Sequence, residues 1–286
     1  MTGQLPFTKM QAIGNDFVVV DEAHWPAAVD WSAIAITLCD RKYGVGSDGL
    51  LVVGPSASAD VRMRMFNPDG TEDMCGNGLR CVVRYAIDHG IASAPVGTAE
   101  SVDGVHAYRD EGETIETEMS TPKFDPADIP VDPALYAASG FAVSDGVERI
   151  RLDSVNTGTT HSVVWCDDYP DDEVFRHWSP RIESAPLFPE RTSVMWAVVE
   201  APNTLRLRIW ERGAGETLGC GTGACAAATL ARKTGRIAAD DITVVSRGGA
   251  LTVRWSGEDG SPVYLAGPAV AVYSGSVPRG TAVAKS

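Results

Sequence analysis

Two cysteines stand in the same short motif, Cys-Gly-x-Gly, once in each half of the 286-residue sequence. The first copy begins at Cys75 and the second at Cys220, so they are separated by 220 − 75 = 145 residues, close to half the chain. A helix-like run follows each motif and stops at a glycine, Gly90 in the first copy and Gly235 in the second. Each cysteine is therefore expected at the amino end of a helix, at equivalent positions of a duplicated unit.

The amino end of a helix favours an anion, because its first N–H groups lack helical partners and the helix dipole adds positive charge. Gly76 and Gly78, repeated as Gly221 and Gly223, are expected to let a carboxylate approach this backbone. The same field stabilises a thiolate. A thiolate and a thiol on opposite sides of a carbon next to a carboxylate would remove and return its proton, with each positioned group contributing ~10²–10⁴ in rate.

A simpler interpretation is that the glycines serve tight turns and the cysteines are small buried hydrophobes. For one motif that interpretation would be favoured. Two motifs at matched positions of a duplicated unit favour chemistry, and the chemistry they favour is epimerisation or racemisation.

The repeat extends beyond the cysteines to the elements that must position them. The stretches VRMRMFN (61–67) and LRLRIWE (205–211) alternate apolar and polar residues, as strands with one buried face do. Hairpin-like stretches follow each helix, with Gly104 and Gly249 in their turns, again 145 residues apart. We therefore predict an α+β fold of two pseudo-symmetric domains, each a mainly antiparallel sheet wrapped round a central helix, with the active site in the cleft between them.

The domain boundaries follow from the repeat and from composition. The Pro-rich segment 119–133 is interpreted as the crossover between the halves. Residues 1–120 with 269–286 would form the domain that carries Cys75, and residues 121–268 the domain that carries Cys220. The polar end, residues 274–286, is expected to be frayed or left over from expression.

Composition excludes several classes of function. A net charge of −14 argues against a nucleic-acid or anionic membrane surface, and no apolar stretch is long enough to cross a bilayer. Six cysteines without a signal peptide indicate a reducing compartment, the cytoplasm. The C-x5-C and C-x4-C spacings do not suit zinc, the five histidines show no paired spacing, and no lysine has a pyridoxal-phosphate setting. We expect neither metal nor cofactor.

Several longer stretches resemble diaminopimelate epimerase, a family of cofactor-independent, two-cysteine amino-acid epimerases and racemases. The resemblance covers roughly residues 5–273. The matching stretches are KMQAIGNDFVVVD, YGVGSDGLL, FNPDGTEDMCGNGLRC, LFPER and WERGAGETLGCGTGACA. It implies interconversion of LL- and meso-diaminopimelate, in lysine and peptidoglycan biosynthesis, by a homodimer acting on a small amino-acid substrate.

The resemblance also implies a role for individual residues. The implied catalytic acid/base pair is Cys75 and Cys220, with His161 and Glu211 tuning the thiols. The residues implied to bind substrate are Asn15, Asn67, Gly76, Asn77, Glu211, Arg212, Gly221 and Thr222, with Arg212 on the distal carboxylate and Glu211 near the distal amine. From sequence alone, Asn15 could equally cap a turn, His161 could be a satisfied sheet residue, and Glu211 and Arg212 an exposed pair.

Three positions depart from the family pattern. Thr159 and Ser193 stand where the family usually has Asn, and Gly49 replaces a Gln seen in some members. These changes leave the reacting end of the substrate untouched and put its distal end in question. The alternatives are a racemase of another amino acid on the same scaffold, a thiol redox or metal-binding protein, and a non-catalytic binding module.

Overall fold

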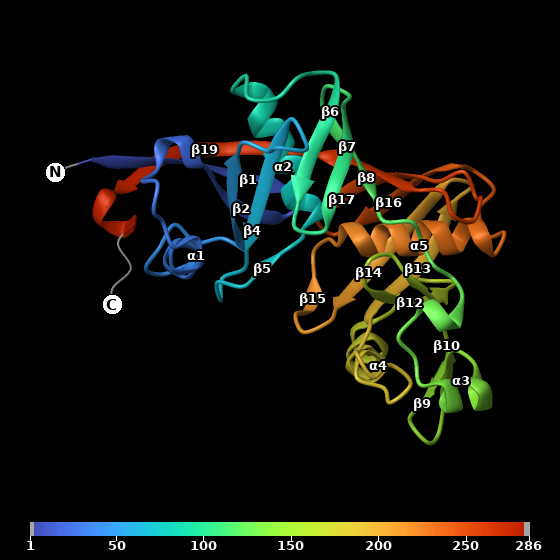
Figure 1. Cartoon of the computed structure of the whole chain (residues 1–286). Coiled ribbons are helices and arrows are strands. Elements are labelled where there is room, and N and C mark those ends of the chain that lie inside the picture. Colours follow the sequence, from blue (N-terminus) through green and yellow to red (C-terminus); the bar gives the residue numbers. More distant parts are fainter. Residues whose placement is uncertain (1–2, 283–286) are drawn as a thin grey trace. The chain divides into compact units, whose positions relative to one another are not determined.

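The computed structural model describes residues 3–282, and the chain divides into two compact units (Figure 1). Unit 1 runs to Thr117 and resumes at Ala266, and unit 2 comprises Glu118–Leu265. The boundaries suggested by the sequence lie three residues after each of these. No helix among the described residues is long and apolar enough to cross a membrane.

Unit 1 contains two helices beside its strands. Its elements are β1 (Gln4–Ala12), β2 (Asn15–Asp21), η1 (Glu22–His24), α1 (Trp31–Cys39), β3 (Gly49–Gly54), β4 (Val61–Phe66), β5 (Glu72–Asp73), α2 (Gly76–Asp88), β6 (Val96–Ser101), β7 (Gly104–Asp110), β19 (Val270–Pro278) and η3 (Arg279–Ala282). The strands β8 (Thr114–Met119) and β18 (Val263–Pro268) each run across a boundary between the units in the sequence.

Unit 2 repeats the order strand, strand, helix, strand, strand, helix. Its elements are η2 (Pro126–Asp128), α3 (Pro133–Ser139), β9 (Ala142–Ser144), β10 (Arg149–Arg151), β11 (Asp153–Asn156), β12 (Thr160–Cys166), α4 (Asp172–Glu183), β13 (Ser193–Ala201), β14 (Thr204–Glu211), β15 (Gly215–Thr217), α5 (Gly221–Lys233), β16 (Asp241–Ser246) and β17 (Gly249–Arg254). The strands β9 and β10 form a separate two-stranded sheet.

The two units share one pattern of strand pairing, as the duplication predicts. In unit 1, β2 and β3 are parallel and pair Phe17 with Gly49; in unit 2, β12 and β13 are parallel and pair Ser162 with Val194, each 145 residues further on. A second parallel pair recurs as β4–β6 and β14–β16. The other strand pairs described within each unit are antiparallel, so the predicted mainly antiparallel sheet is confirmed.

The helix that begins at each Cys-Gly-x-Gly motif is enclosed by its own unit. Helix α2 contacts β1, β2, β3, β4 and β6, and α5 contacts β11 to β14, β16 and β17. Ala224, Ala226, Ala227 and Ala228 of α5 are almost fully buried, because their small side chains let the helix sit close to its strands. Figure 1 shows α5 beside β12, β13 and β14. The predicted central helix is confirmed in each unit.

A second helix covers the opposite face of each sheet, and the sequence interpretation, with one principal helix per half, misses it. Along β2, Phe17 and Val19 pack in the cluster that includes α2, while Val18 and Val20 pack in the cluster that includes α1. In unit 2, Val194 and Trp196 of β13 pack with α4 residues. Each sheet is therefore buried on both faces between two helices.

The chain beyond residue 274 is more ordered than expected. Strand β19 extends to Pro278 and pairs antiparallel with β1, where Leu5 lies opposite Val277 and Gln4 opposite Pro278. The expectation of a frayed end is therefore wrong for residues 274–278, because main-chain pairing with β1 fixes this strand despite its polar composition. Residues 283–286 lie outside the described part of the chain.

Gly90 ends α2 with a backbone φ of +69°, and Gly235 ends α5 with a φ of +72°. A Cβ at Gly90 would meet no atom within 4 Å, so only backbone conformation opposes a side chain there. We expect Gly90→Ala to lower the free energy of unfolding by about 1–2 kcal/mol, and Gly90→Asn by less, since Asn adopts positive φ more readily. Urea denaturation followed by circular dichroism measures both. Equal stability of Gly90→Ala and the wild type would contradict this explanation of the helix end.

Candidate active site

Both motif cysteines cap the helices that follow them. Cys75 has φ −144° and ψ 114°, and Cys220 has φ −136° and ψ 116°, so each is extended directly before its helix. The Cys75 Sγ accepts from the Gly78 N–H and the Cys220 Sγ from the Gly223 N–H, both at 3.4 Å. The sulfur atoms therefore lie at the helix amino ends, as predicted, where an N–H donor and the helix dipole both favour negative charge.

The second glycine of each motif has a packing role that adds to the sequence interpretation. A Cβ at Gly78 would lie 2.8 Å from Leu51 Cδ2, and a Cβ at Gly223 would lie 2.6 Å from the Met195 sulfur and methyl group. These glycines let the first turn approach the sheet. Approach of a ligand to the backbone remains an expectation for both glycines of each motif.

Asn15 is brought to Cys75 by a two-residue turn between β1 and β2. Ala12 pairs with Asn15 across it, and the turn residues Ile13 and Gly14 have φ of +47° and +84°. A buried β-branched residue at positive φ is strained, a state that costs of order 1–3 kcal/mol and tends to occur at functional sites. The turn places Asn15 Oδ1 3.7 Å from Cys75 Sγ.

Asn77, in the first turn of α2, completes the group around Cys75. Its Nδ2 lies 3.4 Å from Asn15 Oδ1, and its own Oδ1 accepts from the Arg80 Nη2 at 2.6 Å. Arg80 is fully buried and also donates to the Gly76 carbonyl. The sequence interpretation missed Arg80, although a charged residue one turn beyond the motif on a buried helix face was a signal.

A hydroxyl and an imidazole lie beside Cys220. The Thr222 Oγ1 is 3.5 Å from the Cys220 Sγ and 3.2 Å from the His161 Nε2. The other ring nitrogen of His161, Nδ1, lies 2.9 Å from the Thr159 carbonyl oxygen and 3.2 Å from the Thr157 hydroxyl. Three of the sequence-predicted site residues of unit 2 thus form one connected group.

Burial keeps the His161 and Cys220 side chains uncharged. Burial, with a smaller contribution from the Arg212 charge, lowers the pKa of His161 to about 4, although its bond to the Thr159 carbonyl opposes this. Burial also raises the pKa of Cys220 well above its ordinary value, and the neighbouring Glu211 carboxylate raises it further. In the ligand-free chain at neutral pH, His161 is therefore an uncharged imidazole and Cys220 a protonated thiol.

Glu211 and Arg212 lie at the end of β14. The Thr217 hydroxyl donates to the Glu211 Oε1 at 2.6 Å, which orients the carboxylate. The Arg212 backbone N–H donates to the Ser193 Oγ, and its Nη1 donates to the Glu190 carbonyl at 3.0 Å. The Ser193 hydroxyl thus holds the Arg212 main chain, a role that its comparison with the Asn usual in the family does not predict.

Buried Glu183 anchors the loop that follows Arg212, and the sequence interpretation missed it. Its Oε1 accepts from the Gly213 N–H and its Oε2 from the Trp210 indole, both at 2.7 Å. An isolated Glu near the end of an amphipathic helix carries no sequence signal for this role. Its partners become visible only when α4 packs on the strands.

Not every sequence-predicted residue joins these two groups. Asn67 follows β4, and its Nδ2 donates to the Thr71 Oγ1 at 3.1 Å within the turn that leads to β5. Thr159 is exposed and contributes its carbonyl to His161. The described contacts therefore place Asn15 and Asn77 with Cys75, and Thr222, His161 and Glu211 with Cys220.

Curated relatives match the chain over nearly its whole length. It is 40% identical over 276 residues to the diaminopimelate epimerase of Desulforudis audaxviator, covering 95% of this chain and 98% of that protein. It is 41% identical over 288 residues to the diaminopimelate epimerase of Desulfovibrio desulfuricans, covering 96% and 99%. These relatives confirm the resemblance read from the motifs.

Solved structures with the same fold share little sequence. A phenazine biosynthesis protein of the PhzF family from Bacillus anthracis has a TM-score of 0.68 at 19% identity, covering 96% of this chain and 99% of that one. A probable proline racemase from Agrobacterium radiobacter has a TM-score of 0.67 at 14% identity, covering 96% and 92%. These structures support the predicted α+β fold.

The family model for diaminopimelate epimerase matches residues 7–124 and 154–272, one segment in each half. The two segments contain both cysteine motifs and the elements that hold them. With the relatives, this match confirms the expectation of an epimerase, and hence of an isomerase: the chain belongs to the diaminopimelate epimerase family.

Proposed function

We propose that the protein interconverts LL- and meso-diaminopimelate by proton exchange at one α-carbon. The observation that carries the proposal is that Cys75 and Cys220 cap equivalent helices in a member of this family. The curated relatives are named diaminopimelate epimerases. We infer the substrate from the name of these relatives and the acid/base chemistry from the two cysteines.

In the proposed reaction one cysteine thiolate takes the α-proton and becomes a thiol. The electron pair of the broken C–H bond moves toward the substrate carboxylate, forming an enolate-like intermediate. The other cysteine then gives its S–H proton to the opposite face of the carbon and becomes a thiolate. The amino ends of α2 and α5 would stabilise the charge that develops on the carboxylate, because positive potential at a helix start acts most strongly where negative charge grows.

The contacts around Cys220 supply a route for its proton. Because the Thr159 carbonyl can only accept, the His161 Nδ1 carries the hydrogen and donates it there. The neutral ring then leaves Nε2 as an acceptor for the Thr222 hydroxyl, whose oxygen in turn accepts from the Cys220 thiol. We propose that His161 and Thr222 adjust the proton affinity of Cys220, while Glu211 keeps it protonated until substrate binds.

We assign binding of the substrate's distal end to charged and amide side chains. Arg212 is exposed at its site and offers a forked donor for the distal carboxylate, with Glu211 next to it for the distal ammonium. Asn15, Asn67 and Asn77 would supply further hydrogen bonds. We also propose that the protein acts as a homodimer without a cofactor, as the resemblance implies. Its cysteine usage and spacing support the cytoplasm as its compartment and a site without metal.

Each cysteine should be separately required for turnover. We expect Cys75→Ala and Cys220→Ala each to lower kcat/KM on LL-diaminopimelate by at least ~10²-fold, since each removes one acid/base group. The measurement is loss of the α-proton signal in D₂O by NMR, combined with steady-state kinetics. Cys166→Ala is the matched control, because Cys166 is a half-buried cysteine on β12 outside either group. Near wild-type turnover by Cys75→Ala would end the two-base mechanism.

Arg212 should determine selectivity for the distal carboxylate. Two charged hydrogen bonds at ~1.5–3 kcal/mol each correspond to a loss of about 10²–10⁴-fold in kcat/KM for Arg212→Ala. Arg212→Lys keeps the charge without the fork and should fall between. A panel of free amino acids is the second measurement. Faster turnover of an amino acid that lacks a distal carboxylate would replace the substrate assignment with that of another racemase, leaving the two-cysteine mechanism in place.

Burial of neutral His161 should make the protein less stable in acid. Its pKa in the folded chain, about 4, lies below its ordinary value of 6.5, so the unfolded chain binds the proton first as the pH falls. Above pH 6.5 the histidine leaves the free energy of unfolding unchanged. Between pH 6.5 and 4 the free energy of unfolding falls, by about 2–3 kcal/mol at pH 4.5. Urea unfolding at pH 7 and 4.5 should show a steeper loss for the wild type than for His161→Gln. Parallel losses would show that His161 is not held neutral.

A further inference from the structure

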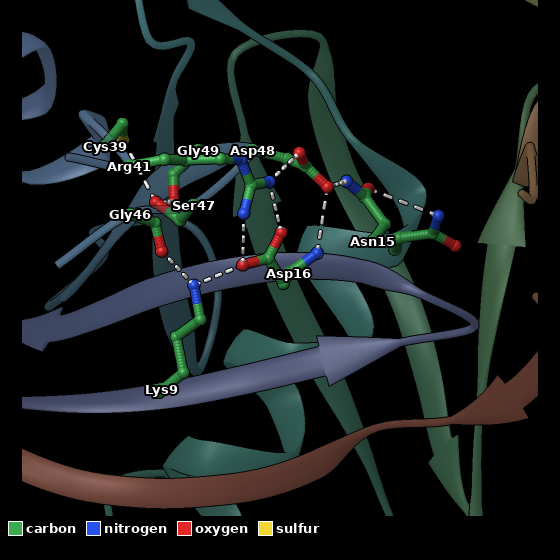
Figure 2. Close-up of polar contacts among 10 residues, drawn as sticks. Lys9, Asn15, Asp16, Cys39, Arg41, Gly46, Ser47, Asp48 and Gly49 are labelled. Carbon is green, nitrogen blue, oxygen red and sulfur yellow. Dashed lines mark hydrogen bonds and ion pairs between the residues drawn. The ribbon is translucent and has the colours of Figure 1, made fainter. Parts of the chain in front are cut away.

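A chain of charged and amide groups runs across unit 1 to Cys75. Asp48, directly before β3, accepts from the Asn15 Nδ2 at 2.8 Å and from the Asp16 backbone N–H at 3.1 Å through the same oxygen, Oδ2. Its other oxygen accepts from the Arg41 Nη2 at 2.5 Å. Figure 2 shows Arg41 between the carboxylates of Asp16 and Asp48, with Lys9 bonded to Asp16 from β1.

This arrangement determines which way the Asn15 amide points. A carboxylate can only accept, so Asp48 requires the NH₂ end of Asn15 on its side. The carbonyl end must then point the other way, toward Cys75 Sγ and Asn77 Nδ2. Buried Arg80 gives an independent check, because it can only donate and so requires the carbonyl end of Asn77, leaving the Asn77 NH₂ to face Asn15.

Asp16 is held charged at neutral pH. Burial raises the pKa of Asp16, but hydrogen bonds from Arg41 and Lys9 outweigh it and lower that pKa to about 2. Arg41 therefore bridges two acidic side chains, and Lys9 also donates to the Gly46 carbonyl in the loop before Asp48. Lys9 of β1 and Asn15 and Asp16 of β2 thus hold the loop that carries Asp48.

Unit 2 forms the equivalent pair of strands without this cluster. The position 145 residues after Asp16 is His161, and the position 145 after Asp48 is Ser193. These two residues pair with each other in the parallel β12–β13 ladder of unit 2, which repeats the β2–β3 ladder of unit 1. Unit 2 thus builds the same pair of strands without a carboxylate at either position, so the charges of unit 1 require another explanation.

We propose that Asp48, held by Arg41, is a positioning residue that fixes the Asn15 amide with its carbonyl oxygen toward Cys75. This oxygen would accept from the Cys75 thiol or from the ammonium group of a bound amino acid. A reversed amide would present a donor to both, which would repel the ammonium group. This inference rests on the proposed function, and it assigns Asp48 and Arg41 a part in the reaction that acts through Asn15 alone.

A double-mutant cycle tests the proposal. Asp48→Asn keeps the side-chain shape but lets position 48 donate, so the Asn15 amide is no longer held in one orientation. We expect it to lower kcat/KM about tenfold in the wild-type background and less than about twofold when Asn15 is already Ala. Asp110→Asn is the matched control: it breaks the Arg84–Asp110 pair of the same unit, whose side chains are 16% and 15% exposed, and should leave kcat/KM unchanged.

A second measurement does not depend on activity. The ¹⁵N side-chain amide resonance of Asn15, identified by its loss in Asn15→Ala, should shift in Asp48→Asn and stay in place in Asp110→Asn. If circular dichroism shows that Asp48→Asn does not fold, Arg41→Gln replaces it in the cycle, because the Arg41 side chain is 59% exposed. Its effect should likewise disappear when Asn15 is Ala.

The outcomes separate the two proposals. An unmoved Asn15 amide in the variant, or losses that multiply in the double mutant, would overturn the positioning role. Wild-type protein that fails to epimerise diaminopimelate would overturn the proposed function, and the amide resonance would still decide the orientation of Asn15.

Discussion

The bond from a helix N–H to a cysteine sulfur is the interaction on which the rest of the structure depends. In each unit the sulfur accepts from the third residue of the helix at 3.4 Å, and the helix is enclosed by the strands of its own sheet. Enclosure restricts water around the helix start, where the low dielectric makes a dipole or a donor act more strongly on a thiol. Glycine at the third helical position suits this close fit, because an added Cβ would displace the end of the Leu51 or Met195 side chain.

The duplication repeats this backbone but gives the two cysteines different surroundings. Cys75 lies near two amides whose orientation is set by charged residues, whereas Cys220 lies near a hydroxyl, a neutral imidazole and a carboxylate. The same strand positions carry Asp16 and Asp48 in one unit and His161 and Ser193 in the other. The backbone symmetry therefore supplies two equivalent helix starts, and the side chains supply the chemical difference between them.

Much of this arrangement could be predicted from the sequence because it depends on local patterns. The 145-residue offset, the period-two strands and the glycine after each helix are set by residues close in the chain, and Gly90 and Gly235 have the positive φ that a helix end favours. The sequence interpretation misses the helices α1 and α4. For α1 a signal was present, because the runs FVVV (17–20) and LLVV (50–53) of unit 1 have no polar alternation. Such runs indicate strands buried on both faces, which require a second helix to cover them.

The contacts that orient the site could not be predicted, because they join residues whose distance is set by the sheet and not by the sequence. Asn15 and Asp48 are 33 residues apart and meet only because β2 and β3 lie parallel with Phe17 opposite Gly49. An epimerase that uses two thiols needs one of them protonated and the other not, at the same pH. Two neighbouring thiols in identical environments can share one proton, because loss of the first proton raises the pKa of the second thiol. Different surroundings add a fixed preference for which of the two sulfur atoms carries that proton. In the proposed reaction, the Glu211 carboxylate beside the buried Cys220 thiol and the fixed amides beside Cys75 would supply this preference.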